Sequence, residues 1–166
     1  MSLALAAVGA ALAALIQSTT IPFAAGGGAE LDLVLVLAIT WTMVAGLEGG
    51  LVWALVGGLI VDVLLMRPLG LTALILTLAV GAAWLMGRVA ARAIYPAIVI
   101  AVLLLAPVTS VVTVVALGVL TGVPGGDPFA DAFTAAIVNG LLAAVVAAVA
   151  VGIHQRLRAA PERAEW

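Results

Sequence analysis

The sequence predicts an all-α polytopic membrane protein with six transmembrane helices. Of its 166 residues, 66% are hydrophobic and only 8% are charged, and the mean hydropathy is +1.40. A water-soluble domain of this length needs a far more polar exterior. Apolar runs of about twenty residues recur along the chain, which is the length that a helix needs to cross a bilayer. We therefore expect one six-helix transmembrane domain over residues 1–155 and a short cytoplasmic tail over residues 156–166.

The residue inventory offers little for catalysis. There is no cysteine, which excludes disulfides and thiolate metal sites, and the one histidine, His154, is interpreted as an interfacial polar residue. No cluster of His, Asp and Glu has metal-ligand spacing, and neither a nucleophile-elbow motif nor a phosphate-binding loop occurs. No basic cluster outside the tail indicates nucleic-acid binding. We expect no catalytic residue, no metal and no cofactor.

The first helix is predicted from Leu3 to about Phe23, where Pro22 and the following glycines end it. No Lys or Arg precedes its apolar start, which favours an uncleaved helix over a cleaved signal peptide. Gln17, in its last third, is expected to hydrogen-bond a neighbouring helix. The second helix is predicted over residues 31–45, with Asp32 at its N-terminus, where an acid complements the helix dipole.

Small residues recur every four positions through the third helix, predicted over residues 49–66. That spacing places them on one face, and in a bilayer small residues let another helix approach closely. We expect this face to be a helix-packing ridge. The next step of four reaches Asp62, and a helix break follows shortly after it. The ridge consists of Gly46, Gly50, Ala54 and Gly58, and the break of Arg67, Pro68 and Gly70.

Asp62 is the ionisable residue that this pattern singles out. A charged group in hydrocarbon costs about 2.5–3.5 kcal/mol on insertion scales, so it must be paired, near the surface or directed at other helices. One interpretation is a structural pair with Arg67 across the helix break. The other is a polar anchor that fixes an outer-leaflet surface for a partner or a ligand. The sequence leaves both open.

The remaining helices are predicted over residues 69–86, 97–120 and 131–153. Pro107 is expected to kink the fifth helix, and nearby hydroxyl groups are expected to satisfy the carbonyls that it frees. The sixth helix repeats the small-residue spacing, and Asn139 is its one strongly polar interior residue. The hydroxyl residues are Thr109, Ser110 and Thr113, and the second ridge includes Gly140 and Ala144.

The basic residues predict the orientation in the membrane. Six helices place both termini on one side, and only Arg67 then falls on the other side. The positive-inside rule therefore assigns both termini to the cytoplasm and places Asp62 and Arg67 near the outer face. The basic residues on the terminal side are Arg88, Arg92, Arg156, Arg158 and Arg163.

The run GGLIVDVLLMRPLGLTALILTLAVGAAWLMGR resembles the core pattern of the MreD family of rod shape-determining membrane proteins. That pattern is a glycine-rich helix ending in Gly-Leu-x-x-Asp, followed by Pro-Leu-Gly and a second apolar helix. Upstream, Gln17 and Asp32 stand at positions that the family favours, whereas Leu31 replaces a frequent proline. The resemblance covers about residues 12–90. The matching core positions are Gly58, Leu59, Asp62, Pro68, Leu69 and Gly70.

The resemblance implies a non-enzymatic scaffold of the cell-elongation machinery in the bacterial inner membrane. Such proteins associate with MreC, a bitopic protein with a periplasmic coiled coil. They work with the MreB filament and with the RodA glycosyltransferase and its partner transpeptidase, in peptidoglycan synthesis.

The family is similar in fold to the substrate-binding S-components of energy-coupling-factor transporters, which supplies an alternative: a vitamin-binding subunit with an outward-facing pocket of polar and aromatic groups. The chain has one Tyr and three Phe for such a pocket. A third class, an intramembrane aspartyl protease, needs two converging Asp residues. Asp62 is the only one inside a predicted helix.

Overall fold

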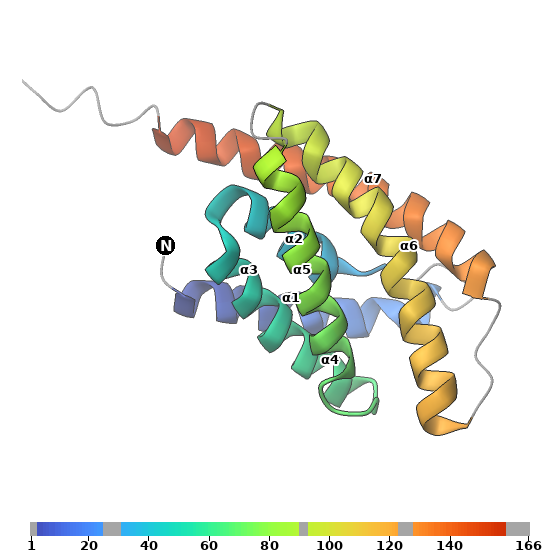
Figure 1. The fold of residues 1–166 in the computed structure, drawn as a ribbon. Helices are drawn as coiled ribbons and strands as arrows, with labels where there is room; N and C mark the ends of the chain where they lie inside the picture. Colours follow the sequence, from blue (N-terminus) through green and yellow to red (C-terminus); the bar gives the residue numbers. More distant parts are fainter. Residues whose placement is uncertain (1–2, 25–30, 90–92, 123–127, 159–166) are drawn as a thin grey trace, which may run out of the picture.

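The computed structural model describes residues 3–24, 31–89, 93–122 and 128–158, and within these ranges the chain is helical and contains no strand (Figure 1). A short π-helical turn joins α3 to α4, so these three elements form one continuous segment. Counted this way, the described chain has six helical segments. The elements are α1 (Leu3–Ala24), α2 (Leu33–Ala45), α3 (Leu47–Val52), η1 (Trp53–Gly57), α4 (Gly58–Leu64), α5 (Leu71–Val89), α6 (Ile94–Thr121) and α7 (Pro128–Arg158).

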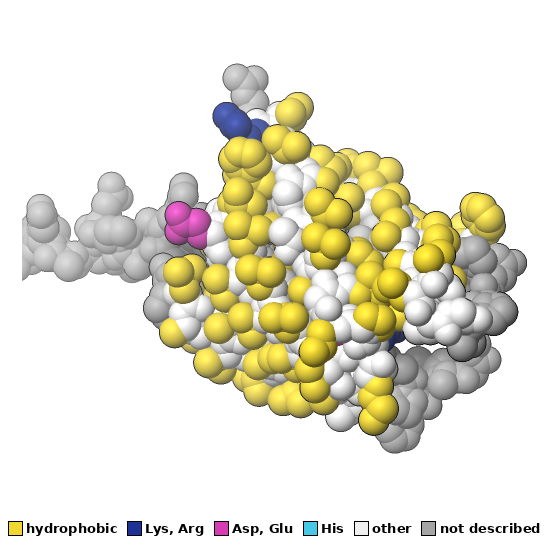
Figure 2. All heavy atoms as spheres, turned by 60° about the horizontal axis from the view of Figure 1, so that its bottom comes forward, with side chains coloured by type: hydrophobic (Ala, Val, Ile, Leu, Met, Phe, Trp, Pro, Cys, Tyr) yellow, Lys and Arg dark blue, Asp and Glu magenta, His cyan; other side chains and the backbone are white. Residues whose placement is uncertain are grey.

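Four helices are long and apolar enough to cross a membrane: Leu47–Leu64, Leu71–Val89, Ile94–Thr121 and, within α7, Ala132–Ala150. Two shorter apolar helices, Leu3–Thr19 and Leu33–Ala45, accompany them. Large apolar side chains are exposed along the long helices, and Figure 2 shows a face covered mainly by hydrophobic side chains. A surface of this kind suits lipid rather than water. The chain is thus a helical membrane protein.

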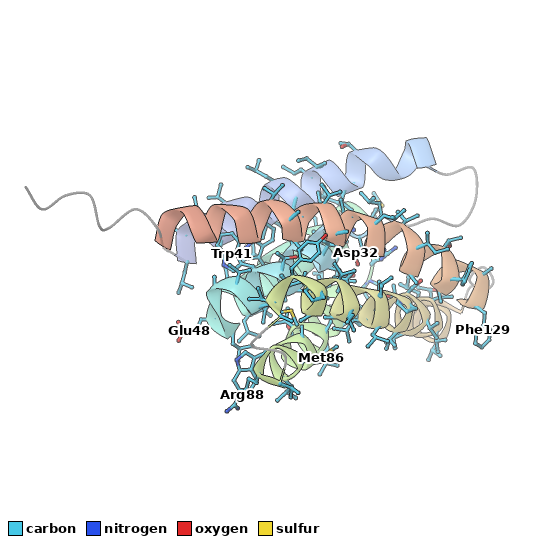
Figure 3. All side chains as sticks on the ribbon, turned by 90° about the horizontal axis from the view of Figure 1, so that it is seen from above. Asp32, Trp41, Glu48, Met86, Arg88 and Phe129 are labelled. Carbon is cyan, nitrogen blue, oxygen red and sulfur yellow. The ribbon has the colours of Figure 1, made fainter. Side chains whose placement is uncertain are left out.

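The helical segments alternate in direction, which sorts their ends into two groups. The start of α1 and the end of α7 lie toward the same side of the molecule (Figure 1). Glu48 in α3 and Arg88 near the end of α5 lie at that end as well, whereas Phe129 at the start of α7 lies at the opposite end (Figure 3). The corner between α4 and α5 therefore lies at the opposite end of the molecule from the start of α1 and the end of α7.

The interior is built largely from alanine and branched aliphatic residues. Ala10 and Ala14 of α1, and Ala143 and Ala147 of α7, are completely buried. Leu35, Ile39, Leu76 and Ile98 are the largest fully buried aliphatic side chains. Small side chains at the contacts allow the helix backbones to approach closely, as is usual between helices in membranes.

The predicted ridge on the third helix contacts two different helices. A Cβ atom added at Gly58 would lie 2.5 Å from the Cα of Ala73, so α4 and α5 meet backbone to backbone there. Gly50 faces Thr42 of α2, and Ala54 is fully buried. Gly46 departs from the prediction because it lies at the junction of α2 and α3, where its φ of 102° is favourable only for glycine.

The buried face of α7 is offset from the predicted ridge. Gly140 packs against Leu103 of α6, as a ridge residue should. Ala144 is only half-buried, and its carbonyl accepts a hydrogen bond from the Tyr95 hydroxyl at 3.3 Å. The fully buried positions, Ala143 and Ala147, stand one residue earlier than the predicted series.

Several predicted boundaries shift by a few residues. Helix α2 starts at Leu33 rather than at residue 31, because Asp32 is its N-cap. Helix α5 continues to Val89, and α7 continues to Arg158, so the first residues of the predicted tail are helical. Some residues used in the predictions lie outside the described residues: the glycines after Pro22, which are Gly26, Gly27 and Gly28, and the basic residues Arg92 and Arg163.

Pro107 lies inside α6, which continues through it as one helix. The Thr109 hydroxyl donates to the carbonyl of Ala106 at 3.0 Å. A proline at position 107 frees the carbonyl four residues earlier, at Leu103, so Thr109 does not satisfy the carbonyl for which it was predicted. Ser110 and Thr113 have a different setting, described below.

Candidate functional site: a corner and a polar pocket

Asp62 is completely buried near the end of α4. Its Oδ2 accepts a hydrogen bond from the backbone N–H of Gly70 at 2.8 Å. Both carboxylate oxygens share the N–H of Thr72, at 3.1 Å and 3.2 Å. The residues just before α5, Arg67 to Gly70, include no side chain of the usual capping types. Asp62 therefore caps α5 from the preceding helix, across the corner.

The end of α4 has the hydrogen-bond pattern of a Schellman motif. The N–H of Arg67 donates to the carbonyl of Asp62 at 2.9 Å, and the N–H of Met66 donates to that of Val63 at 3.4 Å. Met66 takes the left-handed position with a φ of 51°. Asp62 and Arg67 are thus joined through the main chain, and the Asp62 carboxylate is directed at the start of α5.

The corner closes in a tight turn that brings the four predicted corner residues together. The carbonyl of Pro68 accepts a hydrogen bond from Leu71 N–H at 3.2 Å. Gly70 has a φ of 91°, which explains the requirement for glycine there. Two large apolar side chains point away from the protein: Met66 is 96% exposed and Leu69 is 74% exposed.

Beside this corner lies a polar pocket with a volume of about 40 Å³. Five of the six helical segments contribute to its wall, together with Asp32, the N-cap of α2, and residues of the α4–α5 corner. Among the described residues that line it, none is aromatic. The polar residues of the wall are Gln17, Asp32, Arg67, Thr72, Thr109, Ser110, Thr113 and Asn139.

Three of these side chains fix the N-terminus of α2. Gln17 Oε1 accepts from the N–H of Val34 at 3.0 Å, which confirms the prediction that this amide bonds a neighbouring helix. Asn139 Oδ1 accepts from the N–H of Asp32 at 2.7 Å. Asp32 Oδ1 accepts from the N–H of Leu35 at 3.0 Å, which confirms the acid's predicted place at a helix N-terminus. Side-chain oxygens of α1 and α7 therefore accept hydrogen bonds from the backbone at the start of α2, which links these three helices at the pocket wall.

Thr72 differs from the other buried threonines. The hydroxyls of Thr40, Thr42 and Thr109 each donate to a carbonyl three or four residues earlier in their own helix. Thr72 stands in the first turn of α5, it is 8% exposed, and its hydroxyl oxygen has no hydrogen-bond partner among the described residues. A buried hydroxyl without a partner carries a desolvation cost of about 1–3 kcal/mol.

The sequence did not identify Thr72, Ser110, Thr113 and Asn139 as site residues. Asn139 gave a usable signal, because a strongly polar residue inside an apolar helix needs a partner. The hydroxyl residues gave none, since Ser and Thr commonly bond within their own helix. Among the described residues, no group of three or more His, Asp and Glu could hold a metal ion.

Comparison of the chain with protein-family models, with curated proteins and with solved structures finds no match. The assignment of function therefore depends on the sequence resemblance and on the geometry of the corner and the pocket.

Proposed function

We propose that this protein is a non-enzymatic scaffold of the cell-elongation machinery, similar to MreD, that binds an MreC-like bitopic partner. In this proposal it has six spans in the bacterial inner membrane with both termini in the cytoplasm, so that the α4–α5 corner faces outward. The RodA glycosyltransferase with its transpeptidase and the MreB filament are the further members of the assembly that the resemblance implies.

The observation that carries the proposal is the hydrogen bonding of Asp62 to the start of α5. Asp62 and the Pro-Leu-Gly turn that follows it match the MreD-like pattern in residue type and in spacing. In the structure these residues form one hydrogen-bonded corner, which exposes Met66 and Leu69. A hydrogen-bonded turn with exposed apolar side chains suits the docking of another chain.

The alternative is the substrate-binding S-component of an energy-coupling-factor vitamin transporter. The polar pocket favours this alternative, because in the proposed orientation the pocket lies where the outward ends of the helices meet. Two features weigh against it: the described lining has no aromatic residue, and a volume of about 40 Å³ is small for a vitamin. Ligand pockets of drug size are on the order of 300–1,000 Å³.

Co-purification with the MreC-like partner tests the proposal. Wild type, Asp62→Ala and Arg67→Ala are compared at matched membrane levels, with Arg88→Ala at the opposite end of α5 as the control. We expect both corner variants to recover less partner than wild type and the control to recover the same amount. Full recovery with both corner variants would exclude this corner from the interface. Retention of a vitamin by the purified protein would favour the transporter subunit instead.

A further inference from the structure

We propose that the polar pocket binds a neutral hydroxyl-bearing group, of the kind found in sugars and in glycerol, which belongs either to a lipid headgroup or to a free small molecule. The proposal does not depend on the function proposed above, because it concerns a ligand of the pocket and not a partner chain. It starts from three side chains of the wall that keep hydrogen-bonding capacity for a ligand. These are Gln17 of α1 and Ser110 and Thr113 of α6.

Gln17 offers its amide nitrogen to the pocket. The side chain is only 7% exposed, and its Oε1 accepts from the N–H of Val34, whereas its NH₂ group has no partner among the described residues. In that part of the chain, the enclosed side-chain polar atoms without a partner are Trp53 Nε1 and Thr72 Oγ1. The Gln17 nitrogen is not among them, so a molecule of the size of water can reach it from the pocket that the side chain lines. A largely buried amide therefore keeps two N–H donors for a ligand.

Ser110 and Thr113 offer their hydroxyls in the same way. They stand three positions apart on one face of α6, they are half-buried, and neither makes a hydrogen bond within the described chain. Like the Gln17 nitrogen, both hydroxyl oxygens are accessible rather than enclosed. Most other hydroxyls of the described helices donate to a carbonyl three or four residues earlier. Those hydroxyls belong to Ser18, Thr19, Thr40, Thr42, Thr77, Thr109, Thr121 and Thr134.

The charges of the wall favour a neutral ligand. Arg67 and Asp32 carry opposite charges, and each already takes part in other interactions. The groups that remain are an amide and two hydroxyls, and a hydroxyl both donates and accepts hydrogen bonds. A ligand hydroxyl can accept from the amide and exchange hydrogen bonds with Ser110 and Thr113. Apolar side chains complete the wall and suit the carbon that carries such a hydroxyl, among them Val61, Ile75 and Leu76.

The size of the pocket limits the ligand to a small group. A water molecule needs roughly 10–15 Å³ of this kind of space, so about 40 Å³ holds about three waters. A hydroxymethyl group fits in that space, and its oxygen can replace the hydrogen bonds of the waters that it displaces. The rest of a sugar or lipid must lie outside the pocket. The site therefore binds one end of a molecule rather than enclosing all of it.

The test measures the thermal stability of the full protein in nanodiscs. Two probes distinguish the sources of the hydroxyl group: glucose added to discs of phosphatidylcholine alone, and discs that also contain monoglucosyl diacylglycerol. Thr113→Val removes one hydroxyl at nearly constant volume, and Ser110→Ala removes the other. Thr113→Ser retains the hydroxyl. Thr77→Val is the matched control, because its hydroxyl donates to the carbonyl of Ala73 at 2.7 Å and does not line the pocket.

We expect at least one probe to raise the melting temperature of wild type, Thr77→Val and Thr113→Ser. Thr113→Val and Ser110→Ala should each need about threefold to tenfold more of that probe for the same rise, because each loses one neutral hydrogen bond to the ligand. A response to glucose identifies a free ligand, and a response only to the glycolipid identifies a headgroup. No response of wild type to either probe means that the pocket holds water alone. An equal response of wild type, Thr113→Val and Ser110→Ala places the binding elsewhere, and either of these two results overturns the proposal.

Discussion

The carboxylate of Asp62 accepts a hydrogen bond from the backbone N–H of Thr72, ten positions later in the chain. This contact joins the end of one helix to the start of the next and explains why a fully buried acid is tolerated there. Thr72 is also one of the residues that line the pocket. The corner and the pocket therefore share a residue.

Asp62→Ala should destabilise the protein strongly. The substitution leaves the N–H groups of Gly70 and Thr72 without their acceptor, at a cost of about 2–4 kcal/mol in the free energy of unfolding. Asp62→Asn should cost less, since one oxygen remains as an acceptor. Thermal unfolding in a mild detergent measures both, and Glu48→Ala, at an exposed acid, is the control. Equal melting temperatures for Asp62→Ala and the control would show that the cap contributes nothing.

Gly58→Ala should destabilise the contact between α4 and α5. The added methyl group would lie 2.5 Å from the Cα and 2.6 Å from the N of Ala73, and backbone atoms cannot move aside as a side-chain end can. We expect a loss of about 1–3 kcal/mol in the free energy of unfolding. Gly81→Ala is the matched control in α5, because nothing lies within 4 Å of its added methyl. If both variants unfold alike, the two helices are not in backbone contact.

Met66→Gly should stabilise the isolated protein while weakening its interaction with a partner. Met66 holds a left-handed conformation that glycine adopts without steric cost, which favours the variant by about 1 kcal/mol. Its side chain is 96% exposed, so the fold loses little packing when it is removed. A higher melting temperature with lower partner recovery is expected. Unchanged recovery would exclude the side chain from the interface.

Cysteine accessibility should place the two ends of α5 on opposite sides of the membrane. Leu69, just before α5, and Val89, its last residue, are 74% and 90% exposed, so a cysteine at either is sterically accessible. In intact cells, Leu69→Cys should react with a membrane-impermeant maleimide, and Val89→Cys should react only after permeabilisation. The opposite pattern would invert the proposed orientation.

Much of the fold was predictable because hydropathy fixes where apolar helices lie. Each predicted helix has a counterpart within a few residues, but two further features depend on tertiary packing. The π-helical turn over Trp53–Gly57 accompanies the burial of Trp53 against Gly9 and Trp41. No local sequence pattern predicts either the turn or these contacts. The buried face of α7 was misplaced by one residue because alanine is frequent on several of its faces.

The site was predictable only in part. The pattern singled out Asp62, Arg67, Pro68 and Gly70, and these residues do form one corner. It did not reveal that the Asp62 carboxylate caps α5. The available signal was the start of α5, because the residues before it, Arg67 to Gly70, offer no side chain that could cap the helix. The pocket escaped prediction because its wall combines residues from five helical segments and the N-cap of α2, and sequence spacing relates residues within one helix only.

Isolation of the protein from its native membranes in mild detergent, with identification of what co-purifies, tests the proposed function most directly. The scaffold proposal predicts a bitopic protein with one transmembrane helix and a periplasmic coiled coil, recovered with wild type and reduced by Arg67→Ala but not by Arg88→Ala. Recovery of a membrane-bound ATPase module in its place, unaffected by Arg67→Ala, would contradict the scaffold proposal and support the transporter alternative.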